Sequence, residues 1–404
     1  MYVVSQNQIR TTIFATLIDK QYLLKMEIMM KKCVSVLALA MVTVMTVLAQ
    51  EPGEQFTVAT LNVDGLPQKL LVVNVNADGP GDVGTARIGK YLVQKGYDLV
   101  MMQEDFSYHG VLSVWLEDNY KMDEWSGTLY VIGGPRKVDF LHLQNHRFEC
   151  DGLMTAWKND LQVTPAARIP WTQNFGKFSH ALDEMVTKGF RRYEVTLRSG
   201  HRIVVYNMHM DATDNKDESE GKDGPDRDAR MAQWAQLKDD VLQHLDSRPI
   251  IITGDMNSLY GRDDVKGQFI DAINQSGRGT ASDVWVELQR SSVYPSESVT
   301  EATVGDETLD KILYINPTMG INIQPVAITI DREGYVYDGK PLGDHFPVAA
   351  TFQVIQQATN IDEVSPATAV ESKYYDLNGQ RVNKTQKGIY IEQQGKKVEK
   401  RINK

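Results

Sequence analysis

Polar side chains follow apolar strands at several points along this chain of 404 residues. The clearest case is residues 249–257, Pro-Ile-Ile-Ile-Thr-Gly-Asp-Met-Asn, in which three consecutive isoleucines predict a strand buried on both faces. Because strand side chains alternate, Asp255 and Asn257 would point to the same side at the end of this strand. A carboxylate there can orient a water or accept its proton, and an amide can donate to an oxyanion. A strand followed by an Asx turn explains the same residues equally well.

The arrangement recurs, and this favours a functional site over a series of turns. The other strand-end groups are Asn62 with Asp64, Glu104, Asn207 with His209, and Asp344 with His345, while Asp310 lies near the start of its own strand. In layered α/β folds, sites collect at strand ends and their loops. Carboxylates, amides and two histidines, without a Ser or Cys nucleophile motif, suit hydrolysis by water. A hard cation such as Mg²⁺ takes oxygen ligands and polarises phosphoryl oxygens. Zinc is less favoured, because the sequence lacks the His-rich or Cys-rich ligand spacing of zinc sites.

The elements that would position these groups alternate between strands and helices, which predicts a layered α/β fold. Strands are expected at 56–63, 98–103, 190–197, 202–208, 250–254, 309–314, 321–330 and 346–352, and helices at 85–95, 109–119, 229–245 and 262–274. Residues 151–158 and 161–167 suggest a further pair of strands, and 190–208 suggests a hairpin. The charged, Gly-containing stretch 211–228 predicts a solvated loop; a substrate-side loop is the less favoured interpretation.

The N-terminal residues predict export. Lys31 and Lys32 precede the apolar run 34–48, which ends in small residues and predicts a secretory signal cleaved after Ala49. Residues 1–29 are long for the charged region of a signal, so we expect an over-long start. The mature protein would be periplasmic, cell-surface or extracellular. It would keep a single cysteine, Cys150, and therefore no internal disulfide.

Charge and composition predict how the chain is divided into domains. The net charge of −10 argues against an open basic groove for nucleic acid, but does not exclude nucleic acid, since a divalent cation can supply local positive charge. We expect a signal peptide at 1–49, a catalytic domain at 50–354, a polar linker at 355–373 and a small, basic, β-like tail module at 374–404. The alternative is that the tail forms a final hairpin of the main domain.

Six blocks of the sequence resemble those of the endonuclease/exonuclease/phosphatase superfamily, in the order of that superfamily. They are Thr60-Leu-Asn62-Val, Met102-Gln-Glu104, Tyr206-Asn-Met-His209, Gly254-Asp255-Met-Asn257, Asp310-Lys-Ile-Leu and Gly343-Asp344-His345-Phe-Pro-Val. Six blocks in order are far more specific than any one of them. The resemblance implies a DNase I-like, four-layer α/β sandwich, in which two mostly antiparallel sheets pack face to face.

The resemblance also implies a cation site. Glu104 would ligate Mg²⁺, with Asn62 assisting, and Asp344 would lie near the cation or the attacking water. Mn²⁺ and Ca²⁺ are expected substitutes for Mg²⁺.

The implied catalytic residues surround that site. Asp255 would orient or activate the water, Asn257 would hold the phosphate and His209 would contact a phosphate oxygen. His345, positioned by Asp310, would be the acid/base histidine. Whether Asp255 or His345 takes the proton of the water stays open.

Two short segments narrow the resemblance. Asn62-Val-Asp-Gly-Leu-Pro67 and Lys188-Gly-Phe190 resemble segments of sphingomyelinases and related phospholipase C-type members. This implies a phosphodiesterase acting on a phosphate ester, such as a phospholipid head group, with transient membrane-surface contact; we also expect a monomer. The alternatives are a nuclease, an inositol- or sugar-phosphate phosphatase, and a non-catalytic binding protein. Residues 374–382 and 387–391 resemble a C-terminal tail of secreted Bacteroidetes proteins.

Overall fold

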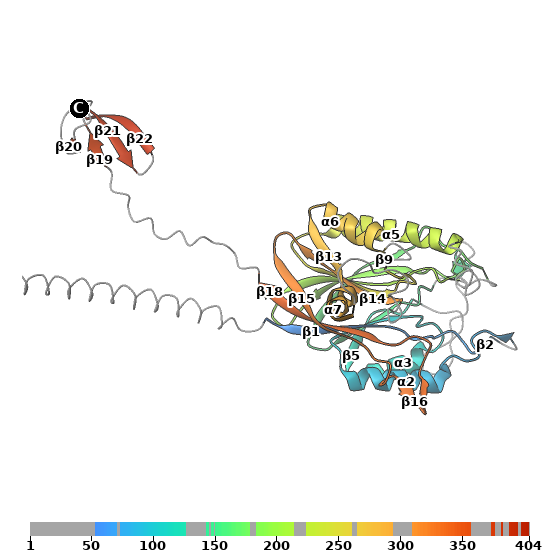
Figure 1. The fold of residues 1–404 in the computed structure, drawn as a ribbon. Helices are drawn as coiled ribbons and strands as arrows, with labels where there is room; N and C mark the ends of the chain where they lie inside the picture. Colours follow the sequence, from blue (N-terminus) through green and yellow to red (C-terminus); the bar gives the residue numbers. More distant parts are fainter. Residues whose placement is uncertain are drawn as a thin grey trace, which may run out of the picture.

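Two six-stranded β-sheets packed face to face form the centre of the protein in a computed structural model (Figure 1). The structure describes residues 53–70, 73–126, 143–144, 147–148, 150–177, 183–213, 224–260, 265–293, 309–356, 373–375, 381–382, 388–394 and 397–403. The predicted signal peptide therefore lies outside the described residues. Among the residues that the structure describes, no helix combines the length and the apolar character needed to cross a membrane.

Sheet I contains both the first and the last strand of the main domain. Its strand order is β15 (Ile321–Ile330), β18 (Val348–Gln356), β1 (Gln55–Asn62), β4 (Leu99–Gln103), β8 (Met154–Lys158) and β5 (Tyr120–Met122). Sheet II has the order β13 (Gly279–Asp283), β14 (Asp310–Pro317), β12 (Ile250–Asp255), β11 (Arg202–His209), β10 (Gly189–Thr196) and β9 (Gln162–Pro170). Each sheet has one parallel pair, β1 with β4 and β11 with β12, and its other pairs are antiparallel.

Helices form the two outer layers. Helices α2 (Gly81–Lys95) and α3 (His109–Leu116) cover the outer face of sheet I, and α5 (Pro225–His244), η1 (Lys266–Asp271) and α6 (Ala272–Gln275) cover that of sheet II (Figure 1). Helix α7 (Val284–Val293) contacts β13, β14 and β15, and so joins the two sheets at one edge. The predicted four-layer α/β sandwich with mostly antiparallel sheets is confirmed. Short strand pairs are β2/β3 (Lys69–Leu70, Val73–Asn74), β6/β7 (Leu143–Gln144, Arg147–Phe148) and β16/β17 (Val336–Tyr337, Lys340–Pro341).

Strand β12 shows how the layers are built. Ile250 and Ile252 pack in the core between sheet II and its helices, together with Trp234 and Phe269. Ile251 points the other way, into the core between the two sheets. A strand at the centre of a sandwich needs apolar residues on both faces, and this explains the run of three isoleucines.

The structure corrects three predictions about elements. The stretches around 151–158 and 161–167 do not pair with each other, because β8 joins β4 and β5 in sheet I while β9 joins β10 in sheet II. The solvated loop does not extend to residue 228. Helix α5 begins at Pro225, a residue suited to the first helical turn, with Asp226 and Asp228 following in that turn. The helix expected at 262–274 is the π-helix η1 followed by α6, and residues 261–264 lie outside the described part.

The C-terminal residues contain a small sheet of their own. Its strands are β19 (Lys373–Tyr375), β20 (Arg381–Val382), β21 (Gly388–Gln394) and β22 (Lys397–Asn403), in the order β20-β19-β21-β22. Strand β18 continues to Gln356, two residues into the predicted linker, and residues 357–372 lie outside the described residues. The domain boundaries stay predictions.

Candidate active site

The predicted site residues meet between the two sheets, at the ends of neighbouring central strands. Asn62 ends β1, His209 ends β11, Asp255 ends β12 and Asp310 begins β14. Strand register aligns His209 with Asp255, and Asp255 with Asp310. Because side chains alternate along β12, Asp255 shares the face of Ile251 and therefore points into the space between the sheets.

The carboxylate of Asp255 is the centre of the site, and only 1% of the residue is exposed. Its Oδ2 accepts a hydrogen bond from Asn62 Nδ2 at 3.1 Å. The same oxygen lies 3.4 Å from Nε2 of His209 and 3.7 Å from Nε2 of His345. Its Oδ1 accepts the backbone N–H of Asn257 at 3.0 Å. Both oxygens are thus held in fixed directions.

Opposite charges make Asp255 and His345 an ion pair. Burial by itself would raise the pKa of Asp255, but the charges of His345 and His209 and the hydrogen bond from Asn62 hold that pKa well below its usual range. Burial would lower the pKa of His345, but the negative charges of Asp310 and Asp255 raise it well above its usual value. Nδ1 of His345 lies 2.7 Å from Oδ2 of Asp310, so the ring presents Nε2 to Asp255.

Glu104 lies on the other side of Asn62, which donates to its Oε1 at 2.9 Å. The same Oε1 is 3.9 Å from Nε2 of His209. The described part of the chain has four non-glycine residues with positive φ, and three of them are at this site: Asp64 at 50°, Glu104 at 55° and Asn257 at 44°. Such conformations cost free energy and cluster at functional sites.

Asp64 belongs to the site, although the sequence analysis did not assign it a role. Burial, followed by the negative charges of Asp344 and Glu104, raises its pKa to about 7. Asn76 donates a hydrogen bond to its Oδ1. Burial likewise raises the pKa of Asp344, and the charge of Glu104 adds to this despite the opposing effect of His345. In the sequence, Asp64 follows Asn62 by two residues, but an acidic residue before Gly and Pro is also typical of a turn, so its role could not be predicted.

This excess of carboxylates suits a hard cation. Glu104, His209 and Asp255 each offer a ligand atom, and these atoms lie within 4.8 Å of one another; Asp255, Asp310 and His345 form a second such group. A divalent cation would relieve the repulsion that raises the pKa of Asp64. The oxygen of Asn62, by contrast, accepts the backbone N–H of Asp64 at 2.9 Å. Asn62 thus holds Glu104 and Asp255 through its amide nitrogen, and its assisting role at the cation stays a prediction.

The structure brings all eight predicted residues together, and the roles assigned to them stay predictions. Two details refine the expectations. The side chain of Asn257 donates to the backbone oxygen of Met210 at 3.1 Å. Nδ1 of His209 is buried and makes no hydrogen bond within the described residues. Asn207, noted in the sequence beside His209, lies beneath the site and accepts from Gln103 Nε2 at 2.7 Å, so it ties the two sheets together.

A buried ion pair that the sequence did not predict lies next to the site. Lys188 is 4% exposed and pairs with Asp183, which is fully buried. Burial would lower the pKa of Lys188, but the charges of Asp183 and Glu104 raise it. Lys188, from the Lys188-Gly-Phe190 segment noted in the sequence, therefore interacts electrostatically with Glu104 of the site.

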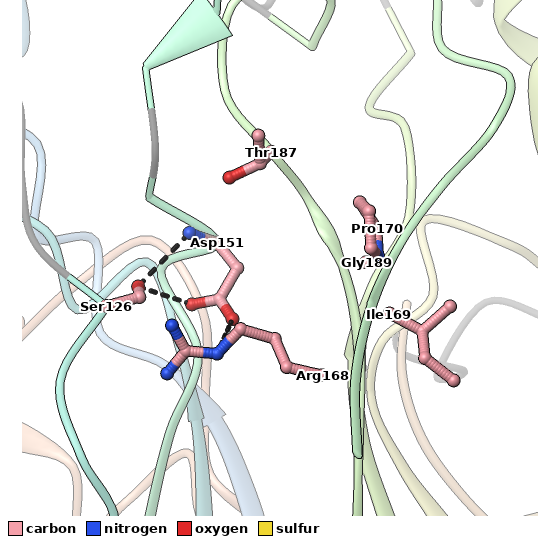
Figure 2. Close-up of a pocket in the computed structure, with 7 residues that line it drawn as sticks. All are labelled: Ser126, Asp151, Arg168, Ile169, Pro170, Thr187 and Gly189. Atoms are coloured by element: carbon pink, nitrogen blue, oxygen red, sulfur yellow. Dashed lines mark hydrogen bonds and ion pairs between the residues drawn. The ribbon is translucent and has the colours of Figure 1, made fainter. Parts of the chain in front are cut away.

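A cavity of about 280 Å³ lies where β9 and the start of β10 in sheet II meet Ser126 and Asp151, which lie outside the strands of sheet I (Figure 2). Figure 2 shows Asp151 between Ser126 and Arg168, with Ile169 on another side of the cavity. None of the eight predicted residues lines it. One hydrogen bond links a wall of this cavity to the site. The backbone oxygen of Gly152, next to Asp151, accepts the backbone N–H of Asp105, the residue after Glu104.

Comparison with known proteins agrees with this geometry. The Endonuclease/Exonuclease/phosphatase family model matches residues 59–314. The sphingomyelinase of Mycobacterium bovis is 28% identical over 305 residues, which are 74% of this chain and 53% of that protein, so the chain spans about half the length of the curated relatives it matches.

Two solved structures are also similar. A humanized D. rerio TDP2 covers 74% of this chain and 98% of its own, at 16% identity and a TM-score of 0.48. A beta toxin from Staphylococcus aureus covers 73% and 99%, at 18% identity and a TM-score of 0.45. The family match alone takes in more than half of the chain, including Glu104, His209 and Asp255. The chain therefore belongs to the Endonuclease/Exonuclease/phosphatase family.

Proposed function

We propose that this protein is a Mg²⁺-dependent phosphodiesterase of the sphingomyelinase or phospholipase C type, which hydrolyses a phosphate ester by in-line attack of water. The observation that carries the proposal is the buried Asp255 carboxylate, held within 3.7 Å of two histidines and beside the acidic group of Glu104, Asp64 and Asp344. Family membership and the likeness to a sphingomyelinase support it.

The ion pair suggests how protons move during the reaction. Asp255 is anionic and His345 protonated in the resting site, so Asp255 holds the water and His345 has the proton to give. Donation from Nε2 of His345 to the leaving-group oxygen removes the positive charge that lowers the basicity of Asp255. Asp255 then becomes a better acceptor for the proton of the attacking water. Transfer of that proton to His345, 3.7 Å away, restores the resting site.

The remaining residues hold the reacting groups in place. Glu104, with Asp64 and Asp344 beside it, would hold the cation. When bound, Mg²⁺ polarises a phosphoryl oxygen and stabilises the leaving-group charge. Asn62 fixes the distance between Glu104 and Asp255 through its two hydrogen bonds. Fixed geometry of this kind lowers the entropic cost of attack.

A panel of substrates tests the proposal. A choline phospholipid, plasmid DNA and a soluble phosphate monoester are each incubated with Mg²⁺ or with EDTA. We expect Mg²⁺-dependent release of the phosphorylated head group, and loss of that release in Asp255→Asn. Cleavage of DNA alone would identify a nuclease, and turnover of the monoester alone a phosphatase. No turnover on any member would overturn the proposal and favour a binding protein.

A further inference from the structure

Tyr335 is a buried phenol at the edge of the site. It lies in the loop between β15 and β16 and is 0% exposed. Its ring packs edge-on against Tyr91, with centroids 5.1 Å apart, and against Phe346 at 6.5 Å. Its hydroxyl makes no hydrogen bond within the described residues. Buried hydroxyl groups are nearly always bonded, so an unpartnered one calls for a physical explanation.

A rigid frame holds this loop. The backbone N–H of Asp331 donates to Pro347 O at 3.0 Å, and the carboxylate of Asp331 accepts from the N–H of Gly334 and the hydroxyl of Tyr91, both at 2.7 Å. Lys95 pairs with the same carboxylate. The position of Tyr335 is therefore built by specific contacts.

The hydroxyl of Tyr335 faces the acidic side of the site. A methyl group added to Gly343 would lie 3.6 Å from this hydroxyl oxygen and 3.6 Å from Cβ of Asp64. The turn that carries Asp344 and His345 thus lies next to both the Tyr335 hydroxyl and Asp64. Burial and the negative charges of Asp64, Asp344 and Asp310 raise the pKa of Tyr335 well above its usual value. At any working pH the phenol is therefore a hydrogen-bond donor beside carboxylates.

We propose that the Tyr335 hydroxyl is a positioning donor for the carboxylate of Asp64, beside Asp344, and that it donates its one hydrogen to Asp64 in the cation-loaded site. The inference rests on the proposed function, because it assigns the partner of a cation-holding group. Outer-shell donors of this kind typically change metal affinity or activity by about 10- to 100-fold when removed. No other described residue donates a side-chain hydrogen bond to Asp64 except Asn76.

Three Tyr→Phe variants, made in the full chain, separate this role from a structural one. Tyr335→Phe keeps the packed ring and removes a hydroxyl that has no partner, so the melting temperature without cation should stay at the wild-type value. Calorimetric titration with Mg²⁺ should show binding weakened by about 10-fold, and kcat should fall by a similar factor. Tyr337→Phe, in the adjacent strand β16 with 53% of the residue exposed, should change none of these quantities. Tyr91→Phe should lower the melting temperature, because it removes the bond to Asp331.

The outcomes are distinguishable. Wild-type Mg²⁺ affinity and turnover in Tyr335→Phe would overturn the inference and leave the proposed function standing. A lowered melting temperature without cation, with unchanged Mg²⁺ affinity, would show that the hydroxyl serves packing and would also overturn it. If the wild-type protein neither binds Mg²⁺ nor turns over any substrate of the panel, the proposed function itself fails.

Discussion

At the scale of single residues, Asp255 is the group on which most of the site converges. Asp255→Asn keeps the shape of the side chain and removes the charge that pairs with His345 and, in the proposed mechanism, orients the water. We expect turnover to fall by about 10²-fold or more. The melting temperature, followed by circular dichroism, should show that the variant is folded. Near-normal turnover would contradict the assignment.

His345→Ala tests whether His345 acts together with Asp255. Because proton transfer between the two residues couples them in the proposed mechanism, the double variant should lose less activity than the product of the two single losses. Full multiplicativity of the losses would mean that the two residues act independently.

Because the pKa of Asp64 is raised, we expect the stabilisation of the folded protein by a bound cation to depend on pH. The pKa of this carboxyl group in the folded protein is raised from 3.8 to about 7, so its ionisation destabilises the fold progressively as pH rises from about 4 to 7. Mg²⁺ favours the ionised carboxylate, so the gain in melting temperature with Mg²⁺ relative to EDTA should grow as pH rises through about 7. Melting curves at pH 5, 6, 7 and 8 measure this, and Asp64→Asn should flatten the dependence. An equal gain at pH 5 and pH 8 would refute it.

The sequence located the eight site residues but not all of their neighbours. Asn62, His209 and Asp255 were predictable because polar groups interrupting apolar strands have few explanations. Asp64 was hidden by an adequate local explanation, a turn. Tyr335 gave no signal, because its place beside Asp64 depends on how the loop between β15 and β18 folds back, and no periodic pattern encodes such a path.

At the scale of elements, the predictions were correct where burial determines the pattern of apolar residues along a strand or helix. The three isoleucines of β12 gave the correct strand because each must pack against one of two cores. The segments around β8 and β9 suggested a pair because they are adjacent and turn-linked. Their true partners, β4 and β10, are distant in sequence, and local propensity does not choose between sheets.

The end of β12 depends on a glycine. Gly254 has φ of 150°, and a methyl group there would lie 2.0 Å from the backbone oxygen of Met208 on β11. We expect Gly254→Ala to lower the free energy of unfolding by on the order of 3 kcal/mol, measured by urea denaturation. Gly200→Ala is the control, since Gly200 also has a positive φ, 84°, but has nothing within 4 Å of the added methyl. Its cost should be only about 1 kcal/mol. Equal costs would show that the contact with Met208 relaxes freely.

At the scale of the whole molecule, we expect the main domain to be complete at β18. Every predicted site residue lies before this strand, which pairs with both β1 and β15. Truncation after Gln357 should therefore leave turnover and the melting temperature of the main domain largely unchanged. Loss of soluble expression, or a sharp fall in melting temperature, would show that the tail sheet is an integral part of the domain.

The proposed export has its own test. Mass spectrometry of protein from the native host should find a mature N-terminus at or near Gln50, because the apolar run 34–48 and the small residues after it resemble a cleaved signal. Detection of an intact Met1 in that sample would refute the prediction.

The pairing of β18 with β1 also bears on synthesis of the chain. Phe56, near the start of the domain, stands opposite Phe352, near its end, and His345 is made only a few residues before β18 begins. A nascent chain on the ribosome therefore holds β1 with one unpaired edge, and it lacks His345, the proposed acid/base histidine, until the predicted domain is almost fully translated. Unpaired edges promote aggregation. A premature stop or a proteolytic cut before residue 345 should thus release an aggregation-prone fragment with no hydrolytic activity.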